Sequence, residues 1–218
     1  MEAKENKLIT AKTARYYTLG NDITKAERIW FACHGYGQLG KYFIQKFKSL
    51  DPDKNFVVVP EGLNRFYLEG FSGRVGATWM TKEARLDDIG DYINYLDTLH
   101  IALGLDEAIE GRELIHFGFS QGVATISRYI ASGLYKPDRA VFWAGSFPPD
   151  LEPVDAKESF KNLPVYTCVG NSDPFVNDDN RHRNDAFYTA AGIAPTHLDF
   201  EGKHDIPGEA LSELIKLF

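Results

Sequence analysis

Residues 113–132 read ELIHFGFSQGVATISRYIAS, and most of what the sequence predicts starts from this segment. Its first part, ELIHF, is an apolar run of strand length, and its last part has helical periodicity. Between them stands GFSQG at 118–122, a G-x-S-x-G pentapeptide. A strand, this pentapeptide and a helix in succession are the context of a nucleophile elbow, a sharp turn that projects the serine hydroxyl from the top of a sheet. We therefore predict that Ser120 is a nucleophile.

Short apolar segments alternate with helical segments along the chain. The expected strands are Arg28–Cys33, Asn55–Pro60, Arg112–Phe117, Arg139–Ala144, Leu163–Val169 and Thr196–Phe200. The expected helices are Lys41–Leu50, Thr81–Leu103, Gln121–Ser132, Asp179–Ala191 and Pro207–Phe218. Apolar runs such as FVVV and AVFWA are typical of strands covered on both faces. The order predicts a three-layer α/β domain, a mostly parallel sheet with helices on both faces. Together with the G-x-S-x-G context at Ser120, it predicts the α/β-hydrolase fold.

Two segments are less regular. Leu8–Leu19 alternates in part, and we expect it to add an antiparallel edge strand or hairpin. Glu61–Met80 is rich in glycine and aromatic residues, and we expect a long irregular loop there, which in compact domains is often functional.

The composition fits one globular domain. With 218 residues, 44% of them hydrophobic, the chain can bury one sizeable core, so we predict a single domain over 1–218 without a separate cap. A net charge of -7 without a basic cluster argues against nucleic-acid binding. The N-terminal residues lack the apolar core of a signal peptide, and no stretch approaches the length of a membrane span, which predicts a cytoplasmic location.

The two cysteines indicate structural and not catalytic roles. Cys33 and Cys168 each end an apolar run, and we expect both to be buried thiols. Metal-ligand spacings such as CxxC or HExxH are absent from the sequence, so we expect no metal and no cofactor.

A serine nucleophile needs a base within hydrogen-bond reach, and in this type of fold an acid and then a histidine follow it in the chain. Of the three downstream histidines, His182 lies in a polar helical stretch and His197 lies within a strand. Only His204 follows the end of a strand, where ligands gather in α/β sheets. Asp173, just after LPVYTCVG, is the predicted acid that orients this histidine, and Asp150 is the alternative.

An acyl-transfer site also needs donors for the oxyanion. HGYG at 34–37 follows the first core strand, and its glycines allow backbone N–H groups to approach a substrate. We predict the backbone N–H groups of Tyr36 and Gln121 as the donors. His34 precedes the serine, against the chain order of the fold, and we expect it to brace this loop.

Apolar side chains follow several strands on the side of the predicted nucleophile. We predict substrate-binding roles for Trp79, Phe147, Phe71 and Met80, with the first two as the acyl wall. The alternative is that each of these side chains packs its loop onto the core.

Four segments together resemble the phospholipase/carboxylesterase family, which contains the acyl-protein thioesterases. They are HGYG at 34–37, GFSQG at 118–122, GNSDPFV at 170–176 and GKHDIP at 202–207. The resemblance spans nearly the whole chain from residue 28. It implies ester hydrolysis by a serine, an aspartate and a histidine, without a cofactor.

The chain also departs from the pattern of that family. Gln38 stands where the family often has an aspartate after HGxG, and Val123 stands where it often has a small residue. The loop at 61–80 is unlike that of the better-known thioesterases. These departures bear on the natural substrate. We therefore use the resemblance to predict the reaction class and not the acyl-protein substrate.

The sequence therefore predicts a serine carboxylesterase that acts on small-molecule esters with short- to medium-chain acyl groups. A thioesterase, lysophospholipase-type or other acyl hydrolase on the same fold is an alternative, as is a non-catalytic binding protein. No segment has the long amphipathic pattern of a lid, so we expect an open site without interfacial activation.

Overall fold

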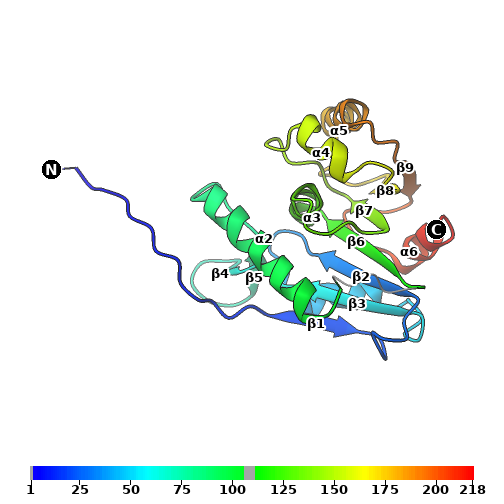
Figure 1. The fold of residues 1–218 in the computed structure, drawn as a ribbon, viewed down its shortest axis with the longest axis horizontal. Helices are drawn as coiled ribbons and strands as arrows, with labels where there is room; N and C mark the ends of the chain where they lie inside the picture. The colour runs from blue at the N-terminus through cyan, green and yellow to red at the C-terminus, as the bar shows by residue number, and fades with distance from the viewer. Residues whose placement is uncertain (1, 106–110) are drawn as a thin grey trace.

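The computed structural model describes residues 2–105 and 111–218, which build a seven-stranded sheet with helices on both faces (Figure 1). The strand order is β1-β3-β2-β6-β7-β8-β9. β1 is antiparallel to β3, and the other neighbouring strands are parallel. The fold class predicted from the sequence is confirmed. The strands are Tyr16–Leu19 (β1), Arg28–Cys33 (β2), Asn55–Pro60 (β3), Glu113–Phe119 (β6), Arg139–Trp143 (β7), Val165–Gly170 (β8) and Thr196–Phe200 (β9).

The helices divide into two layers. One face of the sheet carries α1 (Gly40–Phe43), the 3-10 turn Ile44–Phe47 and α6 (Gly208–Ile215). The other face carries α2 (Arg85–Ala102), α3 (Gln121–Ala131), α4 (Pro153–Ser159) and α5 (Asp178–Ala191). Among the helices of the described residues, none has the length and hydropathy needed to cross a membrane.

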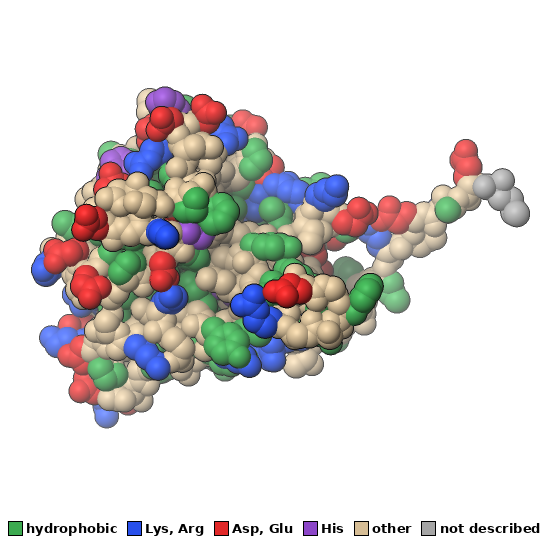
Figure 2. Space-filling model, turned by 180° about the vertical axis from the view of Figure 1, so that it is seen from behind, with side chains coloured by type: hydrophobic (Ala, Val, Ile, Leu, Met, Phe, Trp, Pro, Cys, Tyr) green, Lys and Arg blue, Asp and Glu red, His purple; other side chains and the backbone are tan. Residues whose placement is uncertain are grey.

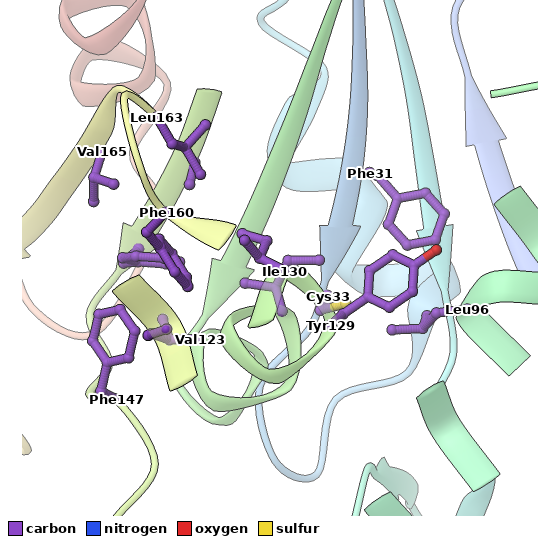
Figure 3. Close-up of a cluster of buried hydrophobic side chains, with 14 of the residues drawn as sticks. Phe31, Cys33, Leu96, Val123, Tyr129, Ile130, Phe147, Phe160, Leu163 and Val165 are labelled. Atoms are coloured by element: carbon purple, nitrogen blue, oxygen red, sulfur yellow. The ribbon is translucent and has the colours of Figure 1, made fainter. Parts of the chain in front are cut away.

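Each face of the sheet has its own hydrophobic core because successive side chains of a strand point to opposite faces. In β2, Phe31 and Cys33 belong to the core beneath α3, whereas Trp30 belongs to the core beneath α1 and α6. Figure 3 shows Val123 and Tyr129 of α3 in the first of these cores. Full burial of one such side chain contributes about 1.5–3 kcal/mol, so α3 is held firmly against the sheet.

The sequence missed three short elements. The segment expected to be irregular contains a hairpin of β4 (Asn64–Tyr67) and β5 (Val75–Thr78), and α4 was not expected. The expected helix over 41–50 is a short α-helical turn followed by the 3-10 turn. Elements of four to seven residues carry too little periodicity to be recognised from a sequence.

The N-terminal residues form the edge of the sheet only in part. Of the expected 8–19 segment, four residues form β1, and residues 2–15 have neither helix nor strand and lead away from the body (Figure 1). Figure 2 shows acidic and basic side chains interspersed over the opposite face, so no large patch of one sign is visible there.

Helix α3 approaches β2 very closely, and glycine makes this possible. A Cβ built on Gly122 would lie 2.1 Å from the carbonyl oxygen of Cys33. A Cβ on Gly118 would lie 2.5 Å from the carbonyl oxygen of Gly122. Since real side chains do not tolerate such distances, both ends of the pentapeptide require glycine.

We predict that Gly122→Ala lowers the free energy of unfolding by about 1–3 kcal/mol or more, because the helix must move away from β2. Gly90→Ala is the matched control, since Gly90 lies within α2 and its Cβ would meet nothing within 4 Å. This control should stabilise the protein by about 0.5–1 kcal/mol. Urea unfolding measures both values, and equal effects of the two substitutions would contradict the close approach.

Candidate active site

Ser120 stands at the junction of β6 and α3 in an unusual backbone conformation. Its φ is 54° and its ψ is -117°, a combination that costs a non-glycine residue about 1–3 kcal/mol. The Ser120 N–H donates a hydrogen bond to the carbonyl of Trp143 at 2.9 Å, which ties the turn to the end of β7. A Cβ on Gly35 would lie 3.1 Å from the Ser120 Cβ, so the loop after β2 reaches the serine. This is the geometry expected of a nucleophile elbow.

Asp173 and His204 meet at the same edge of the sheet. The Asp173 Oδ2 lies 2.7 Å from the His204 Nδ1, and the aspartate side chain is buried. The other carboxylate oxygen accepts the Phe175 N–H at 2.9 Å. Because an ionised carboxylate can only accept, the His204 Nδ1 donates, and the lone pair of Nε2 is left to take a proton.

The His204 ring lies beside the elbow. Its centroid is 4.8 Å from the ring of Phe119, the residue that directly precedes Ser120. On the other side it is 4.8 Å from the ring of Phe175. Three positions far apart in the sequence, Ser120, Asp173 and His204, thus lie at one end of the parallel strands, where ligands of α/β sheets bind.

Asp150, the alternative acid, is held elsewhere. Its carboxylate pairs with Arg85 at 2.5 Å and with Arg128 at 2.6 Å. Partial burial alone would raise the pKa of Asp150, but the hydrogen bonds from Arg128 and Arg85 outweigh it and hold that pKa well below its usual range. The two arginines occupy this carboxylate, which leaves Asp173 as the partner of His204.

The loop after β2 is fixed by hydrogen bonds around Tyr36. The Gly35 N–H donates to the Gln38 Oε1 at 2.8 Å, and the Gly37 N–H donates to the Ala77 carbonyl at 2.8 Å. Within residues 2–105 and 111–218, the Tyr36 N–H lying between them has no hydrogen-bond acceptor. Gln38, a departure from the family pattern, therefore holds the loop from within, a role that the sequence did not indicate.

His34 braces this loop in its neutral form, as expected from the sequence. The Nδ1 donates to the Gly35 carbonyl at 2.7 Å, and the Nε2 accepts the Gly62 N–H at 2.9 Å. Burial lowers the pKa of His34 from its ordinary 6.5 to about 4. A second proton on Nε2 would face the Gly62 N–H, so the brace requires the uncharged ring.

The side chain of Gln121 connects the elbow to the end of β5. Its Nε2 donates to the Met80 carbonyl at 3.0 Å, and its Oε1 lies 3.1 Å from the Thr78 Oγ1. The Trp79 N–H donates to the same Oε1 at 3.3 Å. The sequence suggested only the backbone N–H of Gln121 as functional. That amide is the first of α3 and has no carbonyl partner within its helix.

The side chains predicted to bind substrate do not line one common pocket: the Met80 Sδ lies 3.8 Å from the Nη1 of Arg128, and the other three are placed as follows. Trp79 is 1% exposed, and its Nε1 donates to the His34 carbonyl at 2.8 Å, so we replace its predicted wall role by a bracing role. Phe71 is 97% exposed on the turn between β4 and β5. Phe147 stacks on Phe187 at 4.1 Å and lines a pocket of about 530 Å³ that contains none of the other three.

The two cysteines are free and buried, as predicted. Burial raises the pKa of both Cys33 and Cys168, which keeps them protonated and unreactive. Among the described residues, no three His, Cys, Asp or Glu side chains come together in a group that could hold a metal ion.

A family model described as phospholipase/carboxylesterase matches residues 20–218. Acyl-protein thioesterase 2 from Zea mays has a TM-score of 0.71 and 17% identity, covering 94% of this chain and 97% of that one. A phospholipase/carboxylesterase from Dyadobacter fermentans has a TM-score of 0.68 and 18% identity over 95% of this chain and 97% of that one. Esterase PE8 has a TM-score of 0.66 and 21% identity, covering 95% of this chain and 98% of that one. A comparison with curated proteins found no significant match.

The buried His34 predicts how stability depends on pH. Its pKa is about 4 in the folded chain and near 6.5 in the unfolded chain, so between these values only the unfolded chain takes the proton. The free energy of unfolding should therefore fall by about 3 kcal/mol as the pH drops from 6.5 to 4. Burial and the neighbouring His100 lower the pKa of His116 too, which adds to the fall.

Urea unfolding at pH 7.0, 5.5 and 4.5 tests this dependence, with His34→Gln as the comparison. The substitution lowers stability at pH 7 and should weaken the pH dependence, because glutamine does not titrate. A free energy of unfolding that stays constant over this range would contradict the neutral brace.

Proposed function

Since this chain belongs to the phospholipase/carboxylesterase family, we propose that it is a serine carboxylesterase that hydrolyses short- to medium-chain carboxylic esters. The observation that carries the proposal is the 2.7 Å contact between Asp173 and His204 beside the strained turn of Ser120. A serine, a histidine and an orienting carboxylate are what acyl transfer by a nucleophilic hydroxyl requires.

In the first step, the His204 Nε2 accepts the proton of the Ser120 hydroxyl while the Oγ attacks the ester carbonyl carbon. The negative charge that develops on the carbonyl oxygen is stabilised by the backbone N–H groups of Tyr36 and Gln121. One such donor lowers the barrier by about 2.7–4 kcal/mol in other enzymes. His204 then gives its proton to the departing alkoxide oxygen, and the acyl group stays on Ser120.

In the second step, His204 takes a proton from a water molecule, whose oxygen attacks the acyl carbon. The tetrahedral intermediate collapses, the C–O bond to Ser120 breaks, and the serine oxygen recovers its proton from the histidine. Asp173 remains ionised throughout and stabilises the imidazolium that forms twice in the cycle. The proposed chemistry uses side chains, backbone amides and one water molecule.

Within the described residues, the elements between the main strands are short, which supports the choice of small esters. The β4–β5 hairpin has strands of four residues, and α4 has seven, so neither is a long amphipathic lid. Thioesters are an alternative, since their hydrolysis needs the same groups and one similar structure is named an acyl-protein thioesterase. The cytoplasmic location stays a prediction.

The direct test of the function is turnover of p-nitrophenyl butyrate by the wild type and by Ser120→Ala. We expect the substitution to abolish turnover without unfolding the protein, because the hydroxyl acts only in the chemistry. Circular dichroism and the urea midpoint verify the fold of the variant. Undiminished turnover in a folded Ser120→Ala protein would refute the proposal, and faster turnover of butyryl thioesters would favour the thioesterase alternative.

The identity of the acid gives a second prediction. Asp173→Asn should lower kcat by up to about 10⁴-fold, because the asparagine no longer holds the His204 tautomer that accepts a proton. Asp150→Asn should lower kcat much less and act mainly on stability, since its partners are Arg85 and Arg128. Steady-state kinetics and thermal unfolding of both variants separate these effects. The reverse order of the two kcat losses would make Asp150 the triad acid.

A further inference from the structure

A groove of about 580 Å³ lies next to the loop that is proposed to bind the oxyanion. It begins at Gly37 and Gln38 and runs between α1 on one side and residues 68–75 on the other. The groove is separate from the pocket at Phe147, and none of Ser120, Asp173, His204 and His34 lines it.

The lining of this groove combines apolar surface with positive charge. Leu39, Phe43, Leu68 and Val75 provide the apolar part. The charged side chains of the lining are all cationic, namely Lys41, Lys46 and Arg74. On a chain with a net charge of -7, a groove lined by cations and by no carboxylate is complementary to an anion.

The three cations are not equally available to a ligand. Lys46 pairs with Asp205 at 2.6 Å, and Arg74 pairs with Glu69 at 3.2 Å. The Lys41 ammonium lies 4.7 Å from the centroid of the Tyr42 ring and has no carboxylate within ion-pair distance among the described residues. Lys41 is therefore the cation that can pair with a ligand without breaking an existing ion pair.

The position of the groove indicates which part of an ester enters it. Tyr36, the proposed donor to the carbonyl oxygen, immediately precedes the start of the groove at Gly37. The departing alcohol must instead face His204, whose ring lies against Phe175 of the segment between β8 and α5. An acyl chain that extends from the carbonyl past the loop at 35–38 would enter the groove at Gly37 and Gln38.

We propose that this groove binds the acyl chain of the substrate, that the preferred acyl chains end in a negatively charged group, and that Lys41 pairs with this group. The inference rests on the proposed esterase function and names its substrate class: esters of acids with an apolar stem and a terminal anion, such as half esters of dicarboxylic acids. The apolar stem lies along Leu68 and Val75, the accessible apolar side chains of the lining, and is shielded from water there.

The test compares two p-nitrophenyl esters of equal chain length, the half ester of adipic acid and the hexanoate. The enzymes are the wild type, Lys41→Gln and Lys48→Gln. Lys48 is an exposed lysine just beyond the 3-10 turn and outside the groove, so this control removes the same charge. The measured quantity is the ratio of kcat/KM for the adipate ester to that for the hexanoate.

We expect the wild type to prefer the adipate ester. Lys41→Gln should reduce the ratio by about 3- to 10-fold, mainly through KM, which is the effect of losing one charge pair that is partly shielded from water. Lys48→Gln should leave the ratio unchanged, and added salt should lower the wild-type ratio. A wild-type ratio below one, or equal losses in the two variants, would overturn the inference. Turnover of the hexanoate would still support the esterase function, whereas its absence, together with no turnover of the adipate ester, would refute both.

Discussion

The close contact between the start of α3 and the end of β2 is the constraint on which the rest of the site depends. Gly122 lies so near the carbonyl of Cys33 that no side chain fits, and Ser120 consequently adopts a positive φ of 54°. The free energy cost of this conformation is offset by burial in the core beneath α3, where Val123 and Tyr129 are fully buried. A helix anchored less firmly would relax, and the serine would no longer stand free of the sheet.

The loops around this turn are fixed by polar side chains that are not themselves expected to react. Gln38 holds the loop after β2, His34 connects that loop to Gly62, and Gln121 connects the elbow to residues 78–80. The first two bonds engage the backbone N–H groups of Gly35 and Gly62, and in the third the Gln121 side chain donates to the Met80 carbonyl. Electrostatic stabilisation of this kind depends on donors that are in place before the reaction, and rigid loops provide it.

The sequence predicts the sheet well, and it predicts that Ser120, Asp173 and His204 follow strands, because both follow from short-range patterns. Apolar runs such as that of β2 identify buried strands, and the pentapeptide around Ser120 identifies the turn between a strand and a helix. The contact of Asp173 with His204 follows from their positions after late strands.

The structural roles of Trp79 and Phe147 could not be predicted, because an aromatic residue looks the same in a sequence whether it lines a pocket or packs a loop. Likewise, nothing in the sequence distinguishes Gln38 or the side chain of Gln121 as a brace, since a glutamine finds its partners only in three dimensions.

The central claim is that Ser120 carries an acyl group during turnover. Rapid mixing with p-nitrophenyl butyrate, acid quenching and mass spectrometry of the intact and digested protein measure this directly. The account predicts a burst of p-nitrophenol and one butyryl group per chain, located on the peptide that contains Ser120. Steady turnover with no acylated protein, or an acyl group on another residue, would contradict it.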